Sequence, residues 1–193
     1  MIPEMPIHYI QSMERRLVAA VSETRSPFTG TSQIQDWGGE WWEYQFEMGV
    51  TQGADARRLS AFFAALGGAR GRFLFRDPSV VIPAGIGNPY VTATTASGNS
   101  LATAGWSFGL RAGEFFQLGA DAATRLYQIT EDVVPVGSEA VVKFVPALRG
   151  SVPQGTLLGL DRPTVLLRLA GPVPTVIGNA DKHRFSVTAR EAL

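Results

Sequence analysis

The clearest alternation of apolar and polar residues runs from Trp42 to Met48. Every second residue there is large and apolar, and each residue between them is Glu or Gln. This period of two is typical of a strand with one buried face. Another run, 31–37, precedes this strand, which begins at Glu40, and Gly38-Gly39 separates the two. Because a type I′ turn needs positive φ at both central residues, the Gly-Gly pair predicts a two-residue hairpin. This hairpin would bring Trp37 onto the aromatic face and Trp41 onto the other face.

A helix is predicted directly after this strand. Four apolar residues from Leu59 to Leu66 are spaced i, i+3, i+4 and i+7, which places them in one stripe of a helix. Gly67-Gly68 follows, as is typical of a helix end. The next alternating run, 72–76, contains two phenylalanines and predicts a strand that stops before Pro78. One helix on an aromatic sheet face would bury several large side chains, at about 1.5–3 kcal/mol each.

Runs near both ends of the chain predict further strands. Residues 11–24 contain one apolar run and favour a strand, with a short helix over residues 7–15 as the alternative. Residues 164–170 and 183–189 are also strand-like, and a break rich in Pro and Gly separates them. This C-terminal part is too short to fold alone. We therefore expect it to return to the sheet formed by residues 1–78.

Short strand-like runs, with Gly-containing turns between them, occupy the middle of the chain. The runs are residues 90–95, 100–104, 115–118, 126–129 and 140–145. Short strands at a spacing of about ten residues predict a small barrel or sandwich. Connectors rich in Pro and Gly flank this region. They divide the chain into a first part over residues 1–81, an inserted small barrel over residues 82–152, and closing strands over residues 153–193. The chain is thus predicted to be mainly β with one short α-helix.

Composition narrows the classes of function. The 193 residues are 45% hydrophobic and 18% charged, which suffices for a core. Seventeen basic and seventeen acidic residues give zero formal charge, whereas tightly held nucleic acid needs a basic patch. Cysteine is absent, which excludes disulfides, Cys-based zinc sites and thiol nucleophiles. Neither a signal peptide nor an apolar run of ~18 residues is visible, so we expect a soluble protein without a membrane span.

Candidate catalytic motifs are incomplete in the sequence. The two histidines, His8 and His183, have no evident partners for a triad or a metal site. Gly85-Ile-Gly87 lacks the third glycine of a dinucleotide motif, because Tyr90 holds that position. Carboxylates gather over residues 36–47, where their alternation with aromatic residues favours a solvated or interface face over a glycosidase pair. We therefore expect no enzyme, no metal and no cofactor.

The group of Trp37, Trp41 and Trp42 is the strongest candidate for a binding surface. Aromatic residues pack in cores, stack on sugars or bases, and are enriched in the cores of protein interfaces. The sequence leaves core packing, subunit contact and ligand stacking open for these three residues.

Two arginines and one further tryptophan are the other candidates. Arg72 and Arg76 flank the two phenylalanines of the run 72–76. We expect either that they form a stripe that faces a lumen or another subunit, or that they belong to a strand face that is exposed to solvent. Trp106 lies in the predicted barrel, and we expect it on the solvent side, as a candidate glycan contact.

The chain resembles the distal tail proteins of long-tailed, non-contractile bacteriophages and of their prophage or gene-transfer relatives. The matching segments cover most of the chain. They are residues 26–30 (SPFTG), 35–43 (QDWGGEWWE), 56–66 (ARRLSAFFAAL), 71–78 (GRFLFRDP), 110–119 (LRAGEFFQLG), 125–130 (RLYQIT) and 185–192 (FSVTAREA).

This resemblance implies a fold and an assembly. The fold would be a β-sandwich or split-barrel belt domain that carries one helix and is interrupted by an inserted barrel, which in some members is of the OB type. Six copies would form a hexameric ring, with the inserted domain on its outside. The ring would join the tail tube to the tip hub and surround the DNA exit channel.

The resemblance also implies partners and a location. The partners would be further copies of the chain, the tail tube protein and the tip hub proteins, with DNA only in transit and no membrane insertion. The protein would be assembled in the bacterial cytoplasm and reside at the virion tail tip. The alternative is a carbohydrate-binding module in which residues 90–148 contact host cell-surface glycans. A wall hydrolase is a third hypothesis, and no constellation of catalytic residues favours it.

Overall fold

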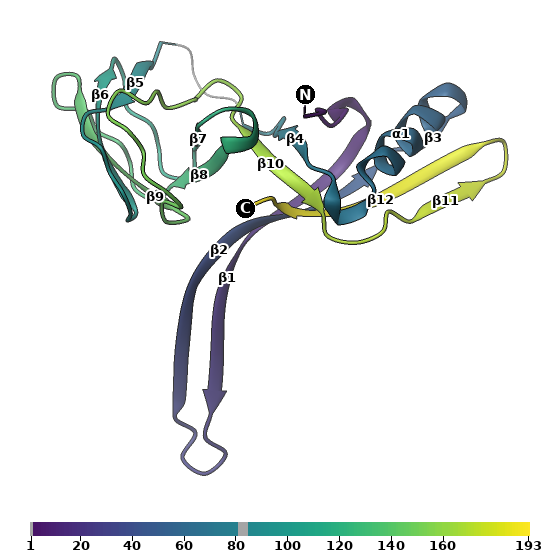
Figure 1. The fold of residues 1–193 in the computed structure, drawn as a ribbon, viewed down its shortest axis with the longest axis horizontal. Helices are drawn as coiled ribbons and strands as arrows, with labels where there is room; N and C mark the ends of the chain where they lie inside the picture. Colours follow the sequence, from purple (N-terminus) through teal and green to yellow (C-terminus); the bar gives the residue numbers. More distant parts are fainter. Residues whose placement is uncertain (1, 81–84) are drawn as a thin grey trace.

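The structure, a computed structural model, describes residues 2–80 and 85–193. This part of the chain is mainly β, with a single α-helix and two curled antiparallel sheets, one of which forms a half-barrel. The predicted fold class is therefore confirmed. Figure 1 shows the two sheets side by side, with a long two-stranded hairpin that projects away from both.

The larger sheet combines strands from both ends of the chain. Its order is β1 (Ile10–Arg25), β2 (Ser32–Met48), β12 (Lys182–Glu191), β10 (Thr164–Leu169) and β4 (Phe73–Arg76). Two short strands, β3 (Thr51–Gln52) and β11 (Thr175–Gly178), also pair with β12. The C-terminal strands thus lie between β2 and β4, which come from the first part of the chain. β1 confirms the strand predicted for residues 11–24. The alternative helix is reduced to one 3₁₀ turn at Ile7–Tyr9.

The hairpin predicted at Gly38-Gly39 is wrong. β1 and β2 form the hairpin instead, and the chain turns between Arg25 and Ser32. The register passes from Ala19 opposite Glu40 to Val21 opposite Asp36, so the two glycines lie in a bulge of β2. Gly38 has φ +69°, and its N–H donates to Asp36 Oδ1 at 2.8 Å. A bulge and a tight turn both use positive φ, so the glycine pair alone does not distinguish them.

The predicted helix is confirmed as α1 (Gly53–Leu66). It buries Ala56, Leu59, Phe63 and Leu66 against the larger sheet. Gly67 ends the helix in the left-handed conformation, at φ +61°. A short 3₁₀ turn, Gly68–Arg70, then leads to β4. Phe73 and Phe75 of β4 are fully buried, as the alternating pattern predicts.

The smaller sheet contains the middle strands of the chain. Its order is β5 (Gly87–Val91), β6 (Ser100–Trp106), β9 (Glu139–Val145), β8 (Arg125–Ile129) and β7 (Phe115–Leu118). β6, β7, β8 and β9 fall on predicted runs, whereas β5 begins before the predicted run 90–95 and overlaps it only at Tyr90 and Val91. A further 3₁₀ turn, Asp121–Ala123, joins β7 to β8. The aromatic rings of Phe116, Tyr127 and Phe144 lie 5.1–5.4 Å apart, at the centre of a second core.

The predicted domain boundary between residues 152 and 153 does not match the structure. Val152, Leu158 and Leu160 are buried in the core of the smaller sheet. The segment after residue 152 therefore stays with the half-barrel, and the chain returns to the larger sheet later than predicted. The other predicted boundary, between residues 81 and 82, lies outside the described residues.

One face of the larger sheet, here called the inner face, is covered at both ends. α1 packs on it through Phe63, whose ring lies 6.0 Å from that of Phe185 on β12. The smaller sheet packs on it through Phe115, whose ring meets Trp42 edge-on at 5.6 Å. Figure 1 shows α1 and the half-barrel at opposite ends of this sheet. The opposite face, here called the outer face, carries mainly polar and charged side chains.

Candidate subunit interface

The distal part of the β1–β2 hairpin, residues 20–37, forms an arm. Beyond the bulge the two strands pair from Val21 and Asp36 to Arg25 and Ser32. Residues 21–25 and 27–37 are all exposed, and Figure 1 shows that the arm leaves the body of the protein. At about 3.4 Å per residue, the paired part is roughly 15–20 Å long. A two-stranded ribbon is at best marginally stable in water without a packing partner.

Large apolar side chains of the arm face solvent. They are Val21, Phe28, Ile34 and Trp37, with 48, 95, 67 and 71% of their surface exposed. Single exposed apolar residues are common on proteins, but a group of them on one projecting element marks an interaction surface. Each would contribute about 1.5–3 kcal/mol if a partner covered it fully.

The tip of the arm is an ordered turn that presents Phe28. Ser26 Oγ accepts hydrogen bonds from the N–H groups of Phe28 and Thr29, at 3.4 and 3.3 Å. Gly30 has φ +71°, and its carbonyl accepts a hydrogen bond from Arg25 Nε at 3.2 Å. The sequence-based candidates did not include Phe28. Its signal in the sequence is a phenylalanine inside a turn motif between two long strands.

The predicted tryptophan group is divided among three environments. Trp37 is exposed on the arm, and Trp41 is half-buried on the outer face, where its Nε1 donates to Glu43 Oε1 at 3.0 Å. Trp42 is buried on the inner face, with its Nε1 donating to Leu126 O at 3.0 Å. The prediction of a subunit contact is therefore wrong for Trp42, because the chain's own smaller sheet covers its ring.

Arg72 and Arg76 lie just before and within β4, on a different strand from these tryptophans. Arg76 ends β4, and its Nε lies 3.4 Å from Glu4 Oε1. Arg72 is exposed just before β4. Two strands, β10 and β12, separate β4 from β2. The structure therefore does not bring the predicted interface residues together in one patch.

The expectation that Trp106 faces solvent is wrong. Only 3% of its surface is exposed, and its Nε1 donates to Thr103 Oγ1 at 2.8 Å. Its ring belongs to the core of the half-barrel, so it is not positioned for glycan contact. The glycan-binding alternative stays a prediction without the residue that motivated it.

Buried charges join the smaller sheet to the larger one. Arg149 Nη1 lies 2.5 Å from Glu191 Oε1, in an ion pair that lacks hydrogen-bond geometry. The other oxygen of Glu191 accepts the N–H of Trp42 at 3.2 Å. Arg149 also donates to the carbonyl of Glu40, whose carboxylate accepts the N–H of Ala147 at 3.1 Å. These contacts fix the orientation of the half-barrel at the base of the arm.

A second buried ion pair lies nearby. Arg15 pairs with Asp77, whose side chain is almost fully buried. The Arg15 guanidinium also lies 3.9 Å from the centre of the Phe115 ring, a favourable cation–π arrangement. Neither pair could be predicted from the sequence, because the two members of each pair are far apart along the chain.

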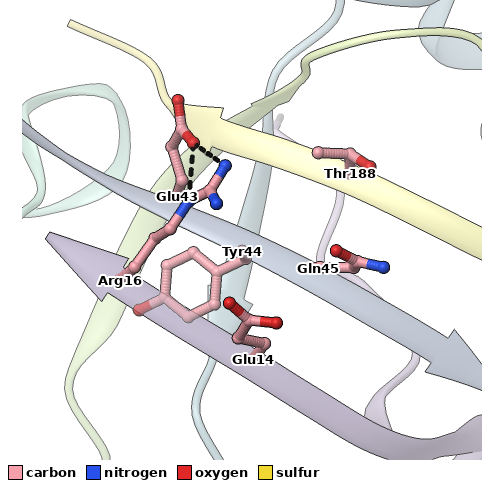
Figure 2. A pocket seen from close by; sticks show the side chains of 6 residues that line it. All are labelled: Glu14, Arg16, Glu43, Tyr44, Gln45 and Thr188. Carbon is pink, nitrogen blue, oxygen red and sulfur yellow. Dashed lines mark hydrogen bonds and ion pairs between the residues drawn. The ribbon is translucent and has the colours of Figure 1, made fainter. Parts of the chain in front are cut away.

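A shallow depression on the outer face is too small for an organic ligand. Figure 2 shows its lining, in which Arg16 of β1 meets Glu43 of β2. Arg16 donates twice to Glu43 Oε2, at 3.0 and 2.7 Å. Hydrogen bonds from Trp41 and Arg16 hold the pKa of Glu43 below its usual value. The depression offers about 20 Å³, room for about one water molecule.

The two histidines do not form a reactive centre with other residues. His8 is exposed, and His183 Nε2 lies 2.8 Å from Asp181 Oδ1 in the β11–β12 hairpin. Within residues 2–80 and 85–193, no three His, Asp or Glu side chains gather as a metal site would require. In the same residues, no helix has the length and apolarity to cross a membrane. No protein-family model matches the chain, and no curated protein matches its sequence.

Proposed function

We propose that this chain is a structural subunit of a phage-type tail tip, which works by its geometry and without catalysis. In this proposal, six copies form a ring that joins the tail tube to the tip hub and surrounds the DNA exit channel. The arm carries the proposal, because its apolar residues stay exposed within the described part of their own chain. The resemblance to distal tail proteins supports it, since two of the resembling segments, 26–30 and 35–43, contain the tip and the bulge of the arm.

The arm and any surface that receives it are different parts of the subunit. A contact of this kind is heterologous, and heterologous contacts close into rings when the rotation between subunits allows it. Full burial of the four exposed apolar residues would supply roughly 6–12 kcal/mol. Association costs about 4–15 kcal/mol. One contact is therefore marginal, and ring closure, which engages every subunit twice, makes the assembly stable.

Sedimentation velocity over a range of concentrations tests the proposal, together with electron microscopy of tail tips. We expect the wild-type chain to form species larger than a monomer as concentration rises. A variant with residues 20–37 replaced by a short turn should stay monomeric and folded. Val141→Thr is the matched control, because Val141 is an exposed apolar residue of the smaller sheet. A wild-type chain that is monomeric at every concentration, and is also absent from tail tips, would refute the proposal.

A further inference from the structure

An arginine pair on the outer face has no acidic partner in the described part of its own chain. Arg168 of β10 and Arg190 of β12 are direct cross-strand partners. Like charges in that position repel each other. Two carboxylates lie close to these arginines in the strand register, but each already forms an ion pair with another arginine. Glu43, opposite Arg190, binds Arg16, and Glu191 binds Arg149.

The arginine pair lines a hollow beside Trp41. The hollow measures about 260 Å³ and is lined by Trp41, Arg168, Arg190, Glu191 and Leu193. Glu191 is already paired with Arg149. Two guanidinium groups next to an indole suit a partner that offers carboxylates together with apolar side chains. The hollow is far larger than the depression at Arg16 and Glu43, and two of the three charged side chains that line it are arginines.

One side of the arm has the complementary chemistry. Val21 pairs with Asp36, and Glu23 pairs with Ile34. Directly opposite residues of an antiparallel pair share a face, as do residues two apart on a strand, so these four side chains lie together. Arg25, opposite Ser32, belongs to the same side, where it donates to the carbonyl of Gly30 in the turn. Neither carboxylate forms an ion pair with the described residues: Glu23 accepts from Ser32 Oγ at 2.6 Å, and Asp36 accepts from the N–H of Gly38. The other side of the arm is uncharged, with residues Ser22, Thr24, Gln33 and Gln35.

We propose that the arm of one copy lies across the outer face of β10 and β12 in the next copy. Glu23 and Asp36 then meet Arg168 and Arg190, while Val21 and Ile34 cover Trp41. This inference rests on the proposed function, because it names the two surfaces that ring closure joins. The occupant is a second copy because Trp41 and Asp36 lie on the same strand, β2. The arm of the same chain leads away from the body of the protein (Figure 1).

The charge spacing on the two surfaces is compatible. Glu23 and Asp36 are diagonal neighbours, about 7–8 Å apart at the backbone, and the directly opposed arginines are about 5 Å apart. Arginine side chains are long and flexible enough to span the difference. Two ion pairs form in the contact, and their strength falls as salt is added.

Charge reversal tests the inference on the full chain. The arm variant is Glu23→Arg with Asp36→Arg, and the face variant is Arg168→Glu with Arg190→Glu. Each reversal turns attraction into repulsion, so each should raise the concentration for half-maximal association about tenfold or more. An equimolar mixture of the two variants should restore association to within about threefold of wild type. In that mixture, every reversed arm can meet a reversed face, and every native arm can meet a native face.

Matched control variants change the charge at positions outside the proposed contact, one pair on the arm and one residue on β12. Thr24→Arg with Gln33→Arg places two arginines on the other side of the arm, and Arg184→Glu reverses an exposed arginine of β12 outside the hollow. Both should associate like wild type. Thermal unfolding checks that every variant folds. If the face variant does not fold, Arg168→Gln with Arg190→Gln replaces it, with an expected weakening of a few-fold.

The outcomes separate this inference from the proposed function. If wild type associates and the mixture does not recover, the arm docks elsewhere, and the inference is wrong while the proposed function stands. If wild type never associates and never enters tail tips, the proposed function itself fails. If the face variant loses binding of inorganic phosphate or DNA but keeps normal association, the arginine pair binds a phosphate group instead of the arm. The inference is then overturned.

Discussion

Replacing Arg149 by Met tests what holds the two sheets together. Arg149 pairs with Glu191, whose side chain has no exposed surface, and it also donates to the carbonyl of Glu40. The methionine keeps part of the apolar stem but leaves the Glu191 carboxylate buried without a counter-charge. Removing one partner of a buried ion pair costs about 3–5 kcal/mol of unfolding free energy. Because the bond to Glu40 is lost as well, we expect a value in the upper half of that range.

Two further variants make the reasoning quantitative. Glu191→Gln keeps an oxygen that accepts the N–H of Trp42, and Arg149 remains partly exposed to water, so we expect a cost of about 1–2 kcal/mol. Lys143→Met breaks an ion pair with Glu131 on the surface, which should cost less than about 1 kcal/mol. The expected order of destabilisation is therefore Arg149→Met, then Glu191→Gln, then Lys143→Met.

Equilibrium urea unfolding measures these free energies. Tryptophan fluorescence reports on the junction through Trp42, and far-ultraviolet circular dichroism reports on both sheets. The protein concentration must be low enough to prevent association, because assembly raises the apparent stability. Midpoints and slopes then give each unfolding free energy. If Arg149→Met lies within about 1 kcal/mol of wild type, or if Glu191→Gln costs more than Arg149→Met, the buried pair does not hold the junction as described.

Three more predictions concern the helix end, the β11–β12 hairpin and the tip of the arm. Gly71→Ala should destabilise more than Gly67→Ala in thermal unfolding. A Cβ at residue 71 would lie 2.3 Å from the carbonyl oxygen of Leu66, whereas a Cβ at residue 67 would meet only the side chain of Arg70. Gly67 has a φ of +61°, and an alanine held at this angle costs about 1 kcal/mol. Hydrogen bonds from His183 and Gly53 lower the pKa of Asp181, so its stabilising effect is fully present above the usual pKa of an aspartate and is lost as pH falls through the lowered pKa. Asp181→Asn should therefore lower the melting temperature more at about pH 7 than near pH 3, and an equal loss at both would contradict this. Phe28→Ala should leave the unfolding free energy within about 0.5 kcal/mol of wild type, because the ring is exposed. The same variant should weaken self-association in sedimentation velocity, and unchanged association would remove Phe28 from the interface.

Local patterns in the sequence were enough to predict most elements. Period two from Trp42 to Met48 and the helical spacing from Leu59 to Leu66 depend on neighbours along the chain. Each was found as predicted, with Trp42 and Leu59 almost fully buried. The short middle strands were located in the same way, because glycine-containing turns separate them.

Features that depend on distant residues could not be predicted. The bulge at Gly38 exists because β1 pairs with both sides of it, and the sequence does not reveal which strand is the partner. Trp106 is buried because the half-barrel curls around it. Arg168 and Arg190 are far apart in the sequence, and only the pairing of β10 with β12 makes them neighbours. The sequence therefore pointed to β2, the strand that carries the exposed Trp37, but not to most of the charged residues of the proposed contact.

The base of the arm and the junction of the two sheets meet at one residue. Glu40 lies at the bulge end of the arm, opposite Ala19. Its carboxylate accepts the N–H of Ala147, and its carbonyl accepts from Arg149, so the segment after β9 holds the strand where the arm begins. A closed ring requires a fixed rotation between successive subunits. If the arm makes the contact between subunits, its direction sets that rotation. The half-barrel then has a role in assembly even if no partner binds it, because it fixes the direction in which the arm leaves the sheet.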